Sequence, residues 1–111
     1  MKTRMIGDVH GLKYELSLVM TNLPEDVTHA IQLGDLGVGF GQSDYWHEDL
    51  DLMLASANAK WIRGNHDNPS ACYDMKTWVP DGTVENDWMF VGGAWSIDYA
   101  WRTRGINLWP S

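Results

Sequence analysis

The sequence predicts an α/β fold, in which a parallel βαβαβ layer is followed by the start of a second β layer. Short apolar segments alternate with amphipathic ones over residues 3–63, a pattern typical of parallel strands joined by crossover helices. From residue 68 onward, turn-forming residues separate shorter β-like segments. Because the 111 residues contain no linker-like stretch, we expect a single domain over residues 1–111.

The elements of the first layer follow from the spacing of apolar residues. Residues 3–6 are predicted as a short buried strand, and residues 29–33 and 60–63 as the second and third strands. Residues 12–22 carry apolar side chains at helical spacing and end before a proline, and residues 45–57 carry them on one face. These two segments are therefore predicted to be the crossover helices.

The last third of the chain predicts the start of the second β layer. Val84 is expected in a short strand. Residues 88–91 and 94–97 are predicted to form an antiparallel pair around Gly92 and Gly93.

Composition excludes several classes of protein. Eight basic residues against fifteen acidic ones give a net charge of −7, so non-specific binding to a nucleic-acid backbone is not expected. Cys72 is the only cysteine, which excludes an internal disulfide framework and a Cys-rich zinc module, and we expect an inert thiol. No apolar run approaches the roughly 20 residues that span a bilayer, so we expect no membrane association. The seven tryptophans either fill the core or cover a surface meant for a partner or for more chain.

Each predicted strand of the first layer ends in a glycine followed by polar residues. The three strand ends are Gly7-Asp8-Val9-His10-Gly11, Gly34-Asp35-Leu36-Gly37 and Gly64-Asn65-His66-Asp67. In open parallel sheets, ligands collect beyond the carboxyl ends of the strands. A mixed set of carboxylate, imidazole and amide groups suits Mn²⁺, Fe or Zn²⁺. We therefore expect a metal site at this edge, with His66 placed to protonate a leaving oxygen.

In this order, the blocks Gly-Asp-Val-His-Gly, Leu-Gly-Asp-Leu-Gly and Arg-Gly-Asn-His-Asp resemble the first three blocks of the calcineurin-like metallophosphoesterases. The opening block is most similar to the phosphoprotein-phosphatase branch and its phage relatives. The resemblance implies hydrolysis of a phosphate ester by metal-activated hydroxide, with two divalent ions, Mn²⁺ being favoured over Fe or Zn²⁺. The implied roles are Asp8 and His10 on the first metal, Asp35 bridging both, Asn65 on the second, His66 as the leaving-group acid and Arg63 near the phosphate.

The chain departs from this family pattern at two places. Val38 and Gly39 stand where the phosphoprotein phosphatases have Asp and Arg. The family also completes its site with three downstream histidines, whereas no histidine of this chain follows His66. We therefore expect the chain to be the N-terminal portion of a calcineurin-like phosphoesterase domain, truncated before those motifs. The alternative is a catalytically inactive metal-binding fragment that acts, if at all, through protein interaction.

The expected partner is a phosphorylated substrate, and the Trp-rich surface would favour a homo-oligomer. We expect a cytoplasmic protein, in the host cytoplasm if the chain is phage-encoded. Plainer roles stay open for individual residues: Asp8 and Asp35 as cap or turn acids, His66 as a turn histidine and Arg63 as a strand-end residue. Asp67 either caps the following turn or orients a neighbour.

Overall fold

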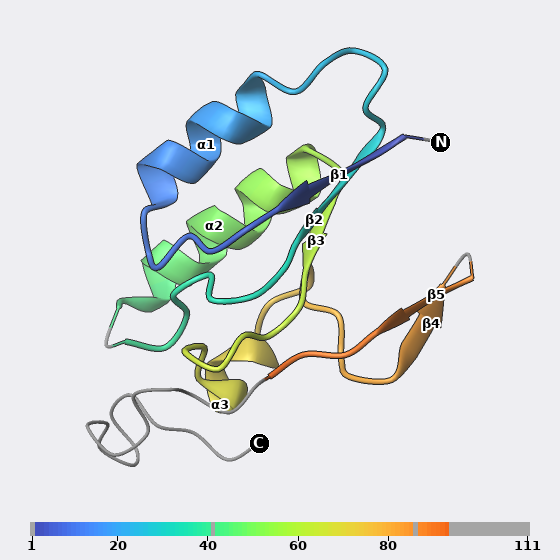
Figure 1. Cartoon of the computed structure of the whole chain (residues 1–111). Helices are drawn as coiled ribbons and strands as arrows, with labels where there is room; N and C mark the ends of the chain where they lie inside the picture. The colour runs from blue at the N-terminus through green and yellow to red at the C-terminus, as the bar shows by residue number, and fades with distance from the viewer. Residues whose placement is uncertain (1, 41, 86, 94–111) are drawn as a thin grey trace.

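The computed structural model describes residues 2–40, 42–85 and 87–93, which form a mixed α/β fold (Figure 1). Its elements in chain order are β1 (Thr3–Ile6), α1 (Lys13–Thr21), β2 (His29–Gln32), α2 (Asp44–Ser56), β3 (Ala59–Trp61), α3 (Pro69–Cys72), β4 (Thr83–Glu85) and β5 (Trp88–Phe90). None of the helices in these ranges is long and apolar enough to cross a membrane.

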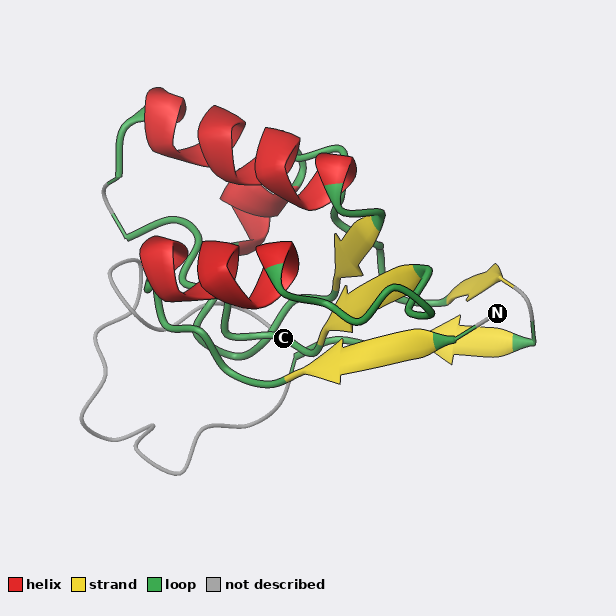
Figure 2. Ribbon diagram, turned by 90° about the horizontal axis from the view of Figure 1, so that it is seen from above, coloured by secondary structure: helices red, strands yellow, loops and turns green. Residues whose placement is uncertain are grey.

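A three-stranded parallel sheet in the order β1-β2-β3 forms the first layer. Its register pairs Met5 with Ile31 and Ile31 with Lys60. Because parallel neighbours need a crossover between them, α1 and α2 connect the strands, and Figure 2 shows the two long helices together on one face of the sheet. All three strands therefore point their carboxyl ends toward the same edge. The predicted α/β fold is confirmed.

The main core fills the space between the two helices and the sheet. The helices contribute four buried side chains, and β2 and β3 contribute three more: Leu16, Met20, Leu50, Leu54, Ala30, Ala59 and Trp61. Trp46 and Trp78 pack against this core, whereas the Trp88 side chain is 41% exposed. The described tryptophans thus fill the core for the most part, and self-association through a Trp-rich surface stays a prediction.

The opposite face of the sheet carries a smaller apolar cluster. Side chains alternate between the two faces of a strand, so Ala30 joins the main core while Ile31 packs with Val79 and Phe90. Phe90 lies on β5, which pairs with β4 as an antiparallel hairpin. This hairpin is the start of the predicted second β layer.

Three features of the structure differ from the sequence-based expectations. The predicted buried first strand is half exposed, with Met5 at 40% exposure, and it lies at one end of the sheet order. The strand at 88–90 pairs with residues 83–85, and the predicted partner at 94–97 lies outside the described residues. A short helix, α3, begins where only a turn was expected, since Asn68 caps its first turn and Pro69 occupies its start.

Candidate metal centre

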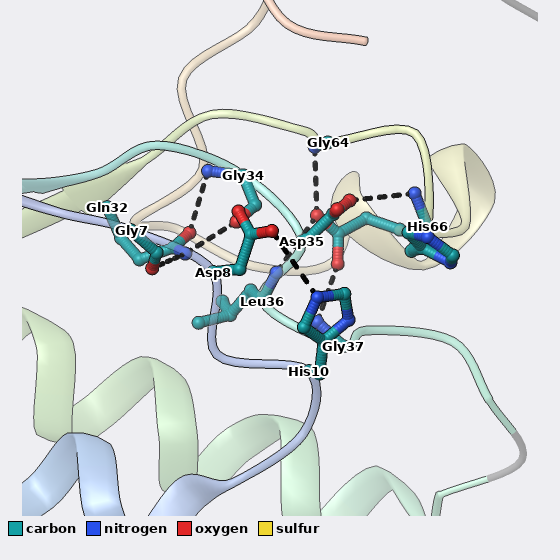
Figure 3. Close-up of polar contacts among 11 residues, drawn as sticks. Gly7, Asp8, His10, Gln32, Gly34, Asp35, Leu36, Gly37, Gly64 and His66 are labelled. Carbon is teal, nitrogen blue, oxygen red and sulfur yellow. Dashed lines mark hydrogen bonds and ion pairs between the residues drawn. The ribbon is translucent and has the colours of Figure 1, made fainter. Parts of the chain in front are cut away.

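The three strand-end loops meet at the carboxyl edge of the parallel sheet (Figure 3). Asp8 and His10 follow β1, Asp35 follows β2, and the Asn65-His66 pair follows β3. A metal site was predicted from the sequence at this edge of the sheet.

Asp8, His10 and Asp35 form a cluster with the chemistry of a metal site. One ligand atom from each lies within 4.8 Å of the others, and His10 Nε2 is 3.4 Å from Asp8 Oδ2. Two ligand atoms of one Mn²⁺ or Zn²⁺ ion, each about 2.0–2.2 Å from it, are at most about 4.4 Å apart. Asp8 and His10 are exposed and Asp35 is 8% exposed. Small rotations of the two exposed side chains would therefore bring the set to coordination distance.

Backbone contacts hold the first loop against the second. The backbone N–H groups of Val9 and His10 donate to the Asp35 carbonyl oxygen at 3.1 and 2.8 Å, and that of Gly11 donates to Leu36 O at 2.9 Å. His10 and Asp35 both adopt left-handed backbone conformations, with φ of 50° and 53°, which are uncommon for residues other than glycine. Of the four non-glycine residues with positive φ in the described part of the chain, these two belong to the Asp8-His10-Asp35 cluster, whereas Asn58 and Asp87 lie in turns elsewhere.

The third loop orients the Asp35 carboxylate. The backbone N–H of His66 donates to Asp35 Oδ1 at 2.9 Å. Gly64 lies so close that a Cβ atom there would meet the backbone nitrogen and carboxylate of Asp35. A glycine at position 64 is therefore required for this approach.

Asp67, in the third loop, binds backbone N–H groups of the second loop. Its side chain is fully buried, and Oδ1 accepts from Gly37 N at 2.7 Å and Val38 N at 3.0 Å. Oδ2 accepts from Leu36 N at 3.2 Å and Gly64 N at 2.9 Å. Of the two roles that the sequence left open for Asp67, these contacts favour the orientation of a neighbouring segment. The two loops are therefore joined in both directions. The Asp67 carboxylate of the third loop accepts from backbone N–H groups of the second, and the Asp35 carboxylate of the second accepts from the backbone N–H of His66.

The remaining residues predicted for the site occupy different positions around this cluster. The His66 ring packs edge-to-face on the His10 ring, with centroids 5.2 Å apart, so His66 borders the Asp8-His10-Asp35 cluster. Asn65 is half-buried in the same loop. Arg63 is buried, and its guanidinium lies 4.0 Å from Asp81 Oδ2 and against Gly93, where a Cβ would collide with it. The roles of Asn65 as a ligand and of Arg63 as a phosphate contact stay predictions.

A family model described as calcineurin-like phosphoesterase matches residues 1–107. The chain belongs to the calcineurin-like phosphoesterase family. The resemblance drawn from the three sequence blocks is confirmed at the level of the family. Comparisons with curated proteins and with solved structures found no match.

This calcineurin-like phosphoesterase carries apolar packing at position 38, where the phosphoprotein-phosphatase pattern has an aspartate. The Val38 side chain is fully buried in the main core, while its backbone N–H is held by Asp67. Position 38 therefore stabilises the loop by burial and offers no carboxylate to the site.

Sequence reasoning missed one functional candidate, Gln32. Its side chain is fully buried and bridges the backbones of Gly7 and Gly34. The available signal was a polar residue after two apolar ones in the predicted strand, directly before the Leu-Gly-Asp block.

The buried thiol of Cys72 belongs to the main core. Burial raises the pKa of Cys72 from 9.0 to about 12, and the nearby Asp67 carboxylate acts in the same direction. The thiol also donates to Asn68 O at 3.2 Å. Cys72 is therefore a protonated thiol at neutral pH. Nucleophilic and metal-binding chemistry both need the thiolate, so we expect Cys72 to take part in neither.

Proposed function

We propose that this chain hydrolyses a phosphate ester at a centre of two divalent metal ions, Mn²⁺ being favoured over Fe or Zn²⁺. The observation that carries the proposal is the convergence of Asp8, His10 and Asp35 at the carboxyl edge of the sheet, in a chain of the calcineurin-like phosphoesterase family. Carboxylate and imidazole donors together suit Mn²⁺, Fe and Zn²⁺.

Each residue has a specific role in this proposal. Asp8 and His10 hold the first ion, Asp35 bridges both, and Asn65 contributes its amide oxygen to the second. When bound, such ions lower the pKa of a coordinated water and neutralise charge on the phosphoryl group.

His66 is the general acid of the proposal and donates a proton to the leaving oxygen of the substrate. It is suited to this role because its ring borders the ligand cluster through its contact with His10. The His66 backbone N–H also donates to Asp35 Oδ1, so a hydrogen bond joins the loop of the proposed acid to the proposed bridging carboxylate.

Electrostatics also favour a metal-bound phosphorylated substrate. The chain has a net charge of −7, which repels a phosphate unless local cations reverse the sign of the potential. The bound ions would supply that positive charge, and the proposal gives Arg63, whose guanidinium lies 4.0 Å from Asp81 Oδ2, the role of a phosphate contact.

Two measurements test this proposal on the same preparations. Calorimetric titration with Mn²⁺ measures binding, and release of nitrophenol from a chromogenic phosphate monoester and a diester measures turnover. We expect Asp35→Asn to abolish metal-stimulated turnover and to weaken Mn²⁺ binding. Asp26→Asn makes the same charge change at an exposed residue paired with Lys2, and we expect it to behave as wild type.

The outcomes separate the enzyme from the inactive alternative. A wild-type rate with Mn²⁺ no higher than that of Asp35→Asn would refute the catalytic proposal. Mn²⁺ binding that depends on Asp35, without turnover of either ester, would instead favour a catalytically inactive metal-binding protein. That alternative is motivated by the absence of any histidine after His66 in this sequence.

A further inference from the structure

A buried polar side chain links the first two ligand loops of this chain. Gln32 ends β2, is fully buried and uses every polar atom of its amide group (Figure 3). Nε2 donates to Gly7 O at 2.9 Å and to Gly34 O at 2.6 Å, and Oε1 accepts from Gly34 N at 3.0 Å. An amide can make these bonds at once because it carries two N–H donors and a carbonyl acceptor.

The bonded glycines directly precede two predicted metal ligands. Gly7 is followed by Asp8, and Gly34 is followed by Asp35. The regular pairing of β1 with β2 ends at Ile6 and Gln32, and Gly34 then turns away with φ of 103°. Gln32 therefore supplies hydrogen bonds between the two backbones at the point where the parallel ladder stops.

Packing alone does not explain a glutamine at this position. Burying an amide costs free energy unless its hydrogen bonds are replaced, and an apolar side chain would fill the space without that requirement. Ala30 and Ile31, which precede Gln32 on the same strand, are apolar and buried. A fully bonded buried amide fixes the geometry of the groups it contacts.

We propose that Gln32 is a positioning residue of the metal centre, which sets the separation of the backbones that carry Asp8 and Asp35. This inference rests on the proposed metal-binding function. Gln32 is not one of the predicted metal ligands and would act through its hydrogen bonds to Gly7 and Gly34. Residues that orient metal ligands typically alter metal affinity by about 10- to 100-fold when they are replaced.

The test compares Gln32→Met with a control of similar destabilising effect. Methionine has nearly the same length as glutamine but none of its hydrogen bonds, so the two glycine backbones lose their link. Leu54→Ala is the control because Leu54 is fully buried on α2 and belongs to the main core. Mn²⁺ dissociation constants are measured by calorimetry at a temperature at which circular dichroism shows both variants folded.

We expect Mn²⁺ binding by Gln32→Met to be weaker than wild type by about 10- to 100-fold. Leu54→Ala should bind within about twofold of wild type, because a core cavity lowers stability without changing the ligand loops. Gln32→Asn, which keeps the amide but shortens its reach, should show the same loss and replaces Gln32→Met if that variant does not fold.

Equal Mn²⁺ affinity in the Gln32 variants, Leu54→Ala and wild type would overturn the positioning role and leave the proposed function intact. Failure of the wild-type chain to bind Mn²⁺ would overturn both. The wild-type titration therefore distinguishes the two failures.

Discussion

Replacing Asp67 with alanine should cost this protein a large part of its stability. The fully buried carboxylate accepts hydrogen bonds from the backbone N–H groups of Leu36, Gly37, Val38 and Gly64. A hydrogen bond to a charged group contributes about 1.5–3 kcal/mol, so four such bonds would sum to more than most single substitutions cost. Because water can enter the space left by the side chain and bind some of these groups, we expect a loss of about 3–5 kcal/mol.

Asp67→Asn gives a graded comparison. One amide oxygen can still accept from two N–H groups, but the new NH₂ group faces the other two donors. We therefore expect a loss of about 2–3 kcal/mol, smaller than that of Asp67→Ala.

Urea unfolding, followed by tryptophan fluorescence and circular dichroism, measures both losses at one fixed pH. The slope of the free energy against urea should be the same in all three proteins, since the surface exposed on unfolding is unchanged. A loss below about 1 kcal/mol for Asp67→Ala, or equal losses for the two variants, would refute the account based on these four bonds.

Three further predictions concern other contacts of the structure. Gly64→Ala should abolish Mn²⁺ binding in calorimetry, because the new Cβ would displace the Asp35 backbone and carboxylate. Above pH 9, the unfolded chain loses the Cys72 proton while the folded chain keeps it up to a pKa of about 12. The contribution of Cys72 to the free energy of unfolding is therefore fully present below pH 9. It should fall by about 1.4 kcal/mol for each pH unit between the two pKa values. Urea unfolding of Cys72→Ser, which does not ionise there, should lack this component of the slope. Asp51→Ala should lower the urea-unfolding free energy by about 1–2 kcal/mol, because its carboxylate accepts from Lys76 N, Thr77 N and Thr77 Oγ1.

The sequence was sufficient for the local elements of the parallel layer. The first strand was predicted with its observed bounds, Thr3–Ile6, and α1 and α2 fall within about a residue of the predicted helices. Hydrophobic spacing determines these elements because each depends on side chains only a few positions apart. The order of strand, helix and strand then implies a common carboxyl edge, so the gathering of Asp8, His10 and Asp35 was also foreseeable.

The contacts that shape the candidate site depend on residues far apart in the chain. Gln32 reaches Gly7 across 25 positions, and Asp67 reaches Leu36 across 31. No local periodicity indicates which buried polar group will meet which backbone, since that pairing exists only after the sheet has formed. The exposure of β1 and the pairing of β5 with β4 have the same origin, because the neighbours of a strand are chosen by packing.

The amino-acid sequence by itself determined the α/β class, the ligand types at the three strand ends and the family. The tertiary structure decided that Asp67 and Gln32 join those strand ends, through hydrogen bonds that are satisfied only in the buried interior. The physical reason is that spacing along a chain specifies which face a side chain occupies, whereas a buried polar group is stable only beside partners that folding brings to it.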